Sequence, residues 1–324
     1  MNTLLVTGAS GFIGSNFVRV FLQSHPEWKI INFDRLAYSG NTNNHEGIDL
    51  NRYSFIKGDI RDAAAVHQVI EKVDAVINFA AETHVDRSID DASDFLTTNI
   101  LGTRILLDAA KKRGVIRFIQ ISTDEVYGSL TTGSASEDSN LLPNSPYSAS
   151  KASSDLMVRA WRETYHFPAI IVRSTNNYGP YQFPEKVIPL FITNLLEGKK
   201  VPLYGDGMNM RDWIYVEDNC RAICLVFDKG DAGETYNIGA GNEMTNIDLT
   251  KKILALMGFG HEMIQKVADR PGHDFRYSVN ISKLKKLGYA AKWNFDQGIQ
   301  QTIKWYTENS NWWKPLKRDK FTLK

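Results

Sequence analysis

Short apolar runs alternate with helical patterns through the first 175 residues, and this alternation strongly limits the possible folds. The expected strands are the runs "TLLVTG", "KIINFD", "YSFIKGD", "DAVINFAA" and "VIRFIQIS". Their apolar residues are nearly continuous, which is typical of strands buried on both faces. Stretches with helical spacing, such as "FIGSNFVRVFLQS", separate these strands. The sequence therefore predicts a doubly wound α/β fold, with a parallel sheet between two layers of helices.

The pattern loosens after residue 175, where shorter elements are separated by glycine and proline. We expect residues 1–175 to form the main domain. Residues 176–324 are expected to form a smaller carboxy-terminal portion that packs over the strand ends. Some strands and helices of this second portion are expected to return to the first domain, since "AIIVRSTNNYGP" still resembles a sheet strand that leads into a loop.

Composition excludes several classes of protein. The net charge is +1, so no overall field attracts nucleic acid or an anionic membrane. The amino terminus lacks the pattern of a signal peptide, and no apolar run is long enough to span a bilayer. Cys220 and Cys224 lie four residues apart in an expected helix, which favours buried small side chains over a disulfide or a metal site. We therefore expect a soluble cytoplasmic protein without a metal.

A glycine-rich stretch, "TGASGFIG", connects the first expected strand to the first helix. Glycines at positions 8, 11 and 14 permit a tight turn and close approach of a pyrophosphate to the helix amino terminus. Asp34 follows at the end of the second strand, where a carboxylate accepts hydrogen bonds from ribose hydroxyls and repels a 2′-phosphate. Arg35 beside it is suited to that phosphate, but the pattern still favours NAD over NADP.

The later strand ends extend this cofactor site. Asp59 and Ile60 are expected beside the adenine, while Ala80 and Ala81 let the dinucleotide lie close; ordinary strand-end packing is the alternative. The predicted cofactor-binding residues are Gly8, Gly11, Phe12, Ile13, Gly14, Asp34, Asp59, Ile60, Ala80, Ala81, Asn99, Tyr147 and Lys151.

Candidate catalytic groups follow the fifth strand. Tyr147 and Lys151 lie four apart at a helix start and face the same way, so that the lysine cation favours a phenolate able to act as a base. Thr123 ends the preceding strand, and the carboxylic acids Asp124 and Glu125 come directly after it. A surface helix pair and helix-capping acids are the alternatives.

Together these motifs resemble the extended short-chain dehydrogenase/reductase superfamily, and within it the nucleotide-diphosphosugar 4,6-dehydratases. The matching stretches include "TGASGFIGSNFV", "NFAAETHVDRSI", "ISTDEVYG", "SPYSASKASSD", "NNYGPYQFPEKVIP", "RDWIYVEDN" and "DRPGHDFRYSVN". In that family the Thr-Asp-Glu triplet is diagnostic. The 4-epimerases of the same fold lack the two acids, and the decarboxylases commonly have serine in place of the first acid.

The resemblance implies a hydro-lyase that oxidises carbon 4 of a glucose unit, removes water across carbons 5 and 6, and reduces carbon 6. It assigns Tyr147 as the base at carbon 4, Glu125 as the base at carbon 5 and Asp124 as the acid at carbon 6. The expected substrate is dTDP-glucose, with UDP-glucose, an epimerase or decarboxylase reaction, and a non-catalytic NAD-binding regulator as alternatives. The product would supply rhamnose or another deoxysugar. The implied substrate-binding residues are His84, Thr123, Asn176, Asn177, Lys186, Arg211, Arg270, His273 and Tyr277.

Two expected helices are apolar over more than one stripe. They carry Phe95, Leu96, Ile100, Leu101, Ile105, Leu106 and Leu107 on the first, and Leu156, Met157, Val158 and Trp161 on the second. An apolar surface this wide is more than a helix needs in order to pack against one sheet. We therefore expect a homodimer in which these helices pack as a bundle, with deep burial inside one chain as the alternative.

Overall fold

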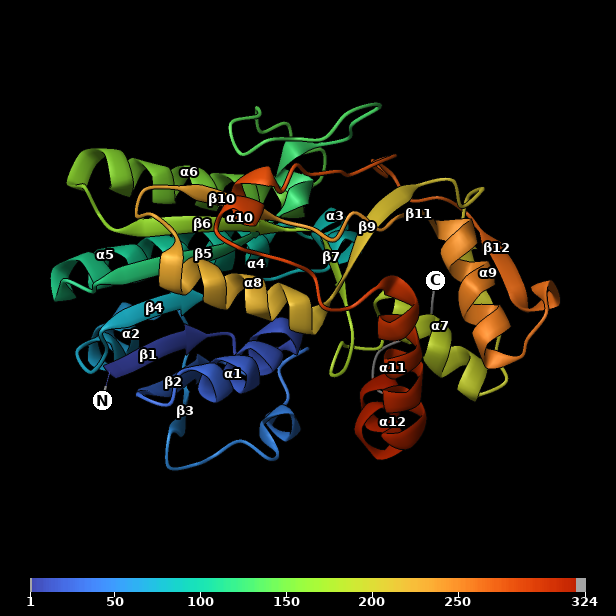
Figure 1. Cartoon of the computed structure of the whole chain (residues 1–324), viewed down its shortest axis with the longest axis horizontal. Helices are drawn as coiled ribbons and strands as arrows, with labels where there is room; N and C mark the ends of the chain where they lie inside the picture. The colour runs from blue at the N-terminus through green and yellow to red at the C-terminus, as the bar shows by residue number, and fades with distance from the viewer. Residues whose placement is uncertain (1, 319–324) are drawn as a thin grey trace.

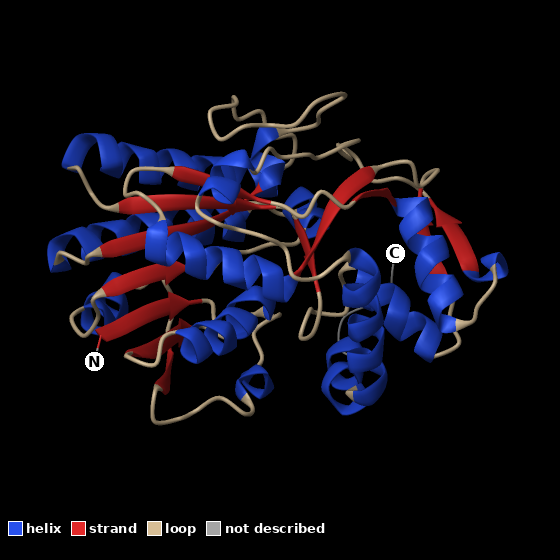
Figure 2. Ribbon diagram, in the orientation of Figure 1, coloured by secondary structure: helices blue, strands red, loops and turns tan. Residues whose placement is uncertain are grey.

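The structure is a computed structural model that describes residues 2–318, and the doubly wound fold is confirmed. Within those residues the main sheet has seven strands, and every neighbouring pair is parallel. Figure 2 shows these strands between layers of helices. Their spatial order is β10 (Thr235–Ile238), β6 (Ala169–Ser174), β5 (Arg117–Thr123), β4 (Ala75–Asn78), β1 (Asn2–Thr7), β2 (Trp28–Asp34) and β3 (Tyr53–Lys57).

Helices bury their apolar stripes against both faces of the main sheet (Figure 1). One face is covered by α1 (Phe12–Ser24) and α8 (Val216–Lys229), which pack side by side. The opposite face is covered by α2 (Ala63–Ile70), α5 (Thr103–Arg113) and α6 (Pro146–Tyr165). Burial on both faces explains why the strands read as continuous apolar runs.

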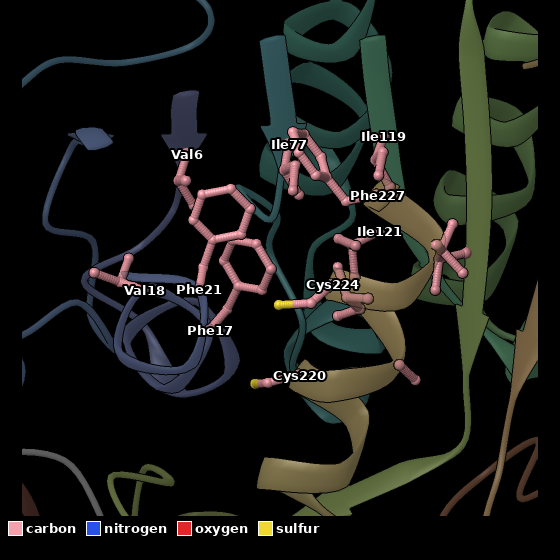
Figure 3. Packing of buried hydrophobic residues seen from close by; sticks show 14 of the residues in the cluster. Val6, Phe17, Val18, Phe21, Ile77, Ile119, Ile121, Cys220, Cys224 and Phe227 are labelled. Carbon is pink, nitrogen blue, oxygen red and sulfur yellow. The ribbon is translucent and has the colours of Figure 1, made fainter. Parts of the chain in front are cut away.

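The core between α1, α8 and the sheet is rich in aromatic residues (Figure 3). Phe21 is fully buried, and its ring centroid lies 5.3 Å from that of Phe17 and 5.1 Å from that of Phe227. Cys220 and Cys224 are both buried in the same cluster with free thiols, as the sequence predicts. They serve there as small apolar side chains.

The second half of the chain contributes to both parts of the molecule. Strand β10 and helix α8 return to the main sheet, where β10 pairs with β6. The other elements form a separate apolar core beside the strand ends. They are β7 (Asn176–Tyr178), β9 (Met210–Tyr215) and β11 (Glu243–Thr245) in one small sheet, the pair β8 (Val201–Tyr204) and β12 (Ile264–Val267), and helices α7 (Val187–Leu196), α9 (Asn246–Met257), α11 (Phe295–Glu308) and α12 (Ser310–Arg318).

The expected apolar helix that carries Phe95 to Leu107 is not a single α-helix. It consists of α4 (Ser93–Phe95), the π-helical segment η2 (Leu96–Gly102) and α5, and it ends at Gly114, whose φ of 73° is left-handed. The remaining short elements are η1 (Thr42–His45), α3 (Val85–Asp90), η3 (Asp124–Tyr127), η4 (His261–Met263) and α10 (Ser282–Lys286). No helix among residues 2–318 is both long enough and apolar enough to cross a membrane.

Replacing Phe21 with alanine tests the importance of this core. Phe21→Ala removes a fully buried ring from the α1–α8 contact and should lower the free energy of unfolding by about 3–5 kcal/mol. Urea unfolding followed by far-UV circular dichroism measures the loss. The control is Leu256→Ala on the exposed side of α9, which should change stability by less than about 0.5 kcal/mol. Equal losses in the two variants would contradict this account of the core.

Candidate active site

One of the cavities among residues 2–318 opens where the carboxyl ends of β1, β2, β4, β5 and β6 meet. Strand register brings these ends together, since Thr7 pairs with Asn78, and Thr123 pairs with Ser174. The predicted site residues that line this cavity are Gly8, Gly11, Phe12, Ile13, Gly14, Asp34, Asp59, Ile60, Ala80, Ala81, Thr123, Asp124, Glu125, Tyr147, Lys151, Asn176, Asn177 and Lys186. Residues from both halves of the chain therefore share one site.

The glycine-rich loop fits a dinucleotide because side chains there would fill the turn. Gly8 has a φ of 70°, and a Cβ atom on it would lie 2.6 Å from the backbone nitrogen of Ala80. A Cβ atom on Gly14 would lie 2.7 Å from the carbonyl oxygen of Gly8. Helix α1 begins after Gly11 without a capping side chain, which leaves amide groups of its first turn available to an anion.

The adenosine end of the cavity carries Asp34 and Arg35. The Asp34 carboxylate accepts hydrogen bonds from the backbone N–H groups of Ser10 (2.9 Å) and Leu36 (2.7 Å), which fix its orientation. Arg35 contacts the carboxylate of Glu82 and lies 3.5 Å from that of Asp59. Because two carboxylates already neutralise Arg35, this arrangement favours NAD over a cofactor with a 2′-phosphate.

The amino terminus of α6 places the tyrosine and the lysine. Ser145 caps this helix in a reciprocal pair with Ser148, and Pro146 occupies the first turn. Tyr147 and Lys151 therefore lie on successive turns, and both are buried. The Lys151 ammonium donates a hydrogen bond of 2.6 Å to the carbonyl oxygen of Ile121 in β5, which ties α6 to the sheet.

Burial and nearby carboxyl groups set the pKa values of these two residues. Burial lowers the pKa of Lys151 to about 8, and the charge of Asp155 opposes that effect. Burial, Glu125 and Asp124 hold the pKa of Tyr147 well above its usual value, while the Thr123 hydroxyl acts in the opposite direction. These surrounding groups therefore favour the neutral form of the phenol.

The two acids occupy the short 3-10 helix η3 at the end of β5. The Thr123 hydroxyl caps this helix by accepting a hydrogen bond from the Glu125 backbone N–H (3.2 Å), and it lies 3.2 Å from Asp124 Oδ1. The other carboxyl oxygen of Asp124, Oδ2, is buried without a partner in the described residues. An acid left in this position is poised to exchange a proton with a bound molecule.

The environments of the two acids differ. Burial and then the charge of Glu125 raise the pKa of Asp124 well above its usual value, with Arg211 as the main opposing group. Burial also raises the pKa of Glu125, but the cations of Arg211, Arg270 and Lys186 all oppose that rise. The arrangement therefore favours a protonated Asp124 beside an ionised Glu125, which suits an acid and a base in one reaction.

Four other residues implied for the substrate lie outside the cavity lining: Arg211, Arg270, His273 and Tyr277. Arg211 is buried and donates to the carbonyl oxygens of Met210, Asp274 and Phe275, while Arg270 lies 3.3 Å from Asp86. His273 and Tyr277 each pair with a nearby aspartate, Asp269 and Asp274 respectively. Both arginines still act on the cavity through their charge, since they oppose the rise in the pKa of Glu125.

His84 and Asn99 make structural contacts in this structure. His84 caps α3 by accepting from the backbone N–H of Arg87, and burial lowers its pKa to about 3, so its ring is neutral. Asn99 exchanges hydrogen bonds with the backbone of Glu82 and donates to Ser150 on α6. These contacts order the loop after β4 and hold it against α6. Neither residue lines the cavity.

Sequence reasoning missed many members of the cavity lining, among them the polar side chains Tyr38 and Glu185. The Glu185 carboxylate lies 3.3 Å from Arg87, and the guanidinium of Arg87 lies 3.8 Å from the centre of the Tyr38 ring. The signal available was the position of Glu185 beside Lys186 in "FPEK". An acid followed by a lysine is too common on solvated surfaces for that signal to stand alone.

Comparison with known proteins identifies the family. The protein-family model described as GDP-mannose 4,6-dehydratase matches residues 5–302. The chain belongs to this family of sugar-nucleotide enzymes. A dTDP-glucose 4,6-dehydratase of Streptomyces niveus is 49% identical over 97% of this chain and 95% of its own. The structure is also similar to a dTDP-glucose 4,6-dehydratase of Streptomyces venezuelae solved with NAD bound, with 51% identity, a TM-score of 0.95, and coverage of 97% of this chain and 99% of that one. A UDP-glucose 4-epimerase of Thermus thermophilus has the same fold, at 29% identity and a TM-score of 0.88 over 95% of this chain and 99% of its own.

The buried acid Asp124 should reduce stability at neutral pH. Its pKa is raised above 3.8 in the folded state, so above about pH 4 the folded chain retains a proton that the unfolded chain has released, and stability falls as pH rises. Asp124→Asn should therefore increase the free energy of unfolding by about 1–2 kcal/mol near pH 7, and the gain should shrink toward about pH 4.

Urea unfolding of both proteins across this pH range measures the effect. The matched control is Asp49→Asn, which removes an exposed carboxylate whose pKa is lowered by hydrogen bonds from Asn51 and Arg52. This control should show no gain in stability. A gain for Asp124→Asn that is constant with pH would mean that Asp124 is ionised in the folded protein.

Proposed function

We propose that the chain is an NAD-dependent dTDP-glucose 4,6-dehydratase that makes dTDP-4-keto-6-deoxyglucose. The observation that carries this proposal is the pair of acids that line the cavity beside Tyr147, the buried Asp124 and the half-buried Glu125. An epimerase needs Tyr147 but not the two acids. A non-catalytic NAD-binding protein needs neither acid. The named relatives support the choice of dTDP-glucose.

The residues divide between two stages of the reaction. In the first, Tyr147 takes the proton of the carbon-4 hydroxyl while Thr123 holds the oxygen and Lys151 stabilises the phenolate. NAD, held by the glycine-rich loop and Asp34, would supply a reversible hydride acceptor for carbons 4 and 6. The carbon-4 ketone then acidifies the hydrogen on carbon 5.

The two acids complete the second stage. Glu125 takes the proton from carbon 5, and Asp124 gives a proton to the carbon-6 hydroxyl, which leaves as water. After reduction of carbon 6, Glu125 returns its proton to carbon 5. Tyr147 then releases the proton that it took from the carbon-4 hydroxyl, and Asp124 takes up one proton, so that each group regains its starting state and carbon 4 remains a ketone. Each carboxyl group thus begins in the protonation state that its environment favours.

We further propose how the chain is divided and where the substrate lies. Residues 1–175 would hold the cofactor, with Gly8, Gly11 and Gly14 at the pyrophosphate and Asp34 at the ribose. Residues 176–324 would hold the nucleotide sugar. Asn176, Asn177 and Lys186 line the cavity where the sugar and its diphosphate would lie, and the side-chain oxygens of both asparagines are buried without a partner among residues 2–318. The buried, reduced thiols of Cys220 and Cys224 support a cytoplasmic location.

A homodimer is the proposed assembly, because a stripe of leucines remains exposed on neighbouring helices. Phe95, Leu106, Leu107 and Val158 are buried within the chain, as the single-chain alternative requires. In contrast, Leu96, Leu101 and Leu156 are 50%, 51% and 53% exposed. These three lie on η2 and α6, which pack together, so a second copy can cover them all.

The reaction is tested by incubating the protein with dTDP-glucose in heavy water and analysing the product by mass spectrometry and NMR. We expect a product that has lost one water, carries solvent deuterium at carbon 5 and forms without net reduction of NAD. Glu125→Gln should lower the turnover rate by about 10²–10⁴-fold, because it removes the base at carbon 5. It should still allow reduced cofactor to form, because oxidation at carbon 4 does not require it.

Two outcomes would contradict this proposal. Dehydration of UDP-glucose with no action on dTDP-glucose would exclude the thymine nucleotide. Epimerised substrate without loss of water would exclude the dehydratase reaction itself.

The assembly is tested by Leu101→Glu and Leu156→Glu, which place a charge on the exposed leucine stripe. Light scattering after gel filtration should give twice the chain mass for the unaltered protein and the single-chain mass for each variant. The control is Leu50→Glu, which alters an exposed leucine in a loop between β2 and β3 and should leave the dimer intact. A monomeric unaltered protein would rule out the dimer.

A further inference from the structure

A buried ion pair lies behind the candidate active site, and the proposed reaction does not use it. Asp155 lies one helical turn after Lys151 on α6, and its Oδ2 accepts a hydrogen bond of 2.9 Å from Nε of Arg173 in β6. The two residues are 1% and 5% exposed. Removing two charges from water costs as much as their attraction returns, so an apolar pair would serve the core equally well. Stability alone therefore gives no reason for this pair.

Arg173 also connects the ion pair to the segment that carries the two acids. Its Nη1 donates a hydrogen bond of 2.8 Å to the hydroxyl of Tyr127, and its guanidinium lies 4.9 Å from the centre of that ring. Tyr127 is the last residue of η3, the 3-10 helix that begins with Asp124 and Glu125. The helix with the tyrosine and lysine is thus connected to the helix with the acids through Arg173.

The far end of this connection is equally well fixed. The Tyr127 hydroxyl donates a hydrogen bond of 2.8 Å to Oδ1 of Asn237 in β10. The Asn237 side chain in turn donates to the carbonyl oxygens of Ala135 and Asn280. Every side chain in the series Asp155, Arg173, Tyr127 and Asn237 is buried. A connected series of hydrogen bonds in a dry interior restricts the arrangement of the groups that it joins, although Oδ1 of Asp155 has no partner among the described residues.

We propose that Arg173 and Tyr127 are positioning residues that hold η3, and with it Asp124 and Glu125, in register with Tyr147 and Lys151 on α6. This inference rests on the proposed function. It adds that the two stages of the reaction depend on different parts of the structure. Helix α6 positions the residues for oxidation at carbon 4, and the connection through Arg173 positions the acids for the elimination. Such a device is needed because a small displacement of a proton-transfer group costs much of its catalytic effect.

Tyr127→Phe tests the proposal, because it removes both hydrogen bonds at the hydroxyl and keeps the ring. In single-turnover experiments with dTDP-glucose, oxidation at carbon 4 should remain within about twofold of the unaltered rate, while elimination slows about tenfold, or ~1.4 kcal/mol in the barrier. Reduced nicotinamide should therefore accumulate on the enzyme and be visible by its absorbance. KM should change little, because no substrate contact is removed.

Arg173→Lys provides a second variant that keeps the charge. Lysine lacks the planar guanidinium group that donates to both Asp155 and Tyr127. This variant should therefore accumulate reduced nicotinamide, as Tyr127→Phe does. The matched control is Tyr236→Phe, which removes another buried hydroxyl, one that accepts from the backbone N–H of Asp231. It should lose similar stability without any change in the ratio of the two rates.

The outcomes separate this inference from the proposed function. If the unaltered protein fails to dehydrate dTDP-glucose, the proposed function is wrong. If it turns over normally and Tyr127→Phe leaves the elimination rate unchanged, the positioning role is wrong. Accumulation of reduced nicotinamide in Tyr236→Phe as well would also overturn it, because the effect would then follow from lost stability.

Discussion

Two neighbouring acids, the buried Asp124 and the half-buried Glu125, lie at the carboxyl end of β5, and much of the surrounding structure follows from this constraint. A carboxylate in an apolar site is strongly disfavoured, so the fold must either supply cations or leave the group protonated. For Glu125 the fold supplies cations, since Arg211, Arg270 and Lys186 come from the carboxy-terminal half of the chain. Asp124 is instead left protonated. The small sheet and its loops thus complete the electrostatics of a site that the main sheet begins. Neither half of the chain supplies that environment alone.

Much of the fold and the cofactor side of the site could be predicted, because their signals are local in sequence. A continuous apolar strand, a glycine at a left-handed turn and an acid at the next strand end, as at Gly8 and Asp34, each reflect the backbone nearby. The π-helical segment η2 could not be predicted in this way. Its spacing of apolar residues is too similar to that of an α-helix for the sequence pattern to distinguish the two. The return of β10 to the sheet was expected only in general terms, because pairing with β6 depends on residues more than sixty positions away.

Some features of the site depend on tertiary contacts and could not be predicted from the sequence. Tyr38 and Glu185 enter the cavity lining from distant loops, and their contacts with Arg87 leave no periodic trace in the sequence. His84 caps α3 by accepting from the backbone N–H of Arg87, and its role at the substrate stays a prediction. The pair Tyr147 and Lys151 was located correctly on one helix face, but spacing cannot reveal the net field. That field is dominated by burial and by two carboxyl groups, and it raises the pKa of the phenol.

The position of β10 in the main sheet also bears on how the protein is made. Strand β6 ends at residue 174, yet its outer neighbour is not synthesised until residues 235–238. During synthesis the first six strands can assemble, but the edge of β6 keeps a row of open backbone groups while some sixty further residues are added. Helix α8, which covers α1 and the adjoining strands, arrives only shortly before β10. The nascent chain therefore passes through a stage with both an open sheet edge and an uncovered aromatic core, the two kinds of surface through which partly folded chains associate.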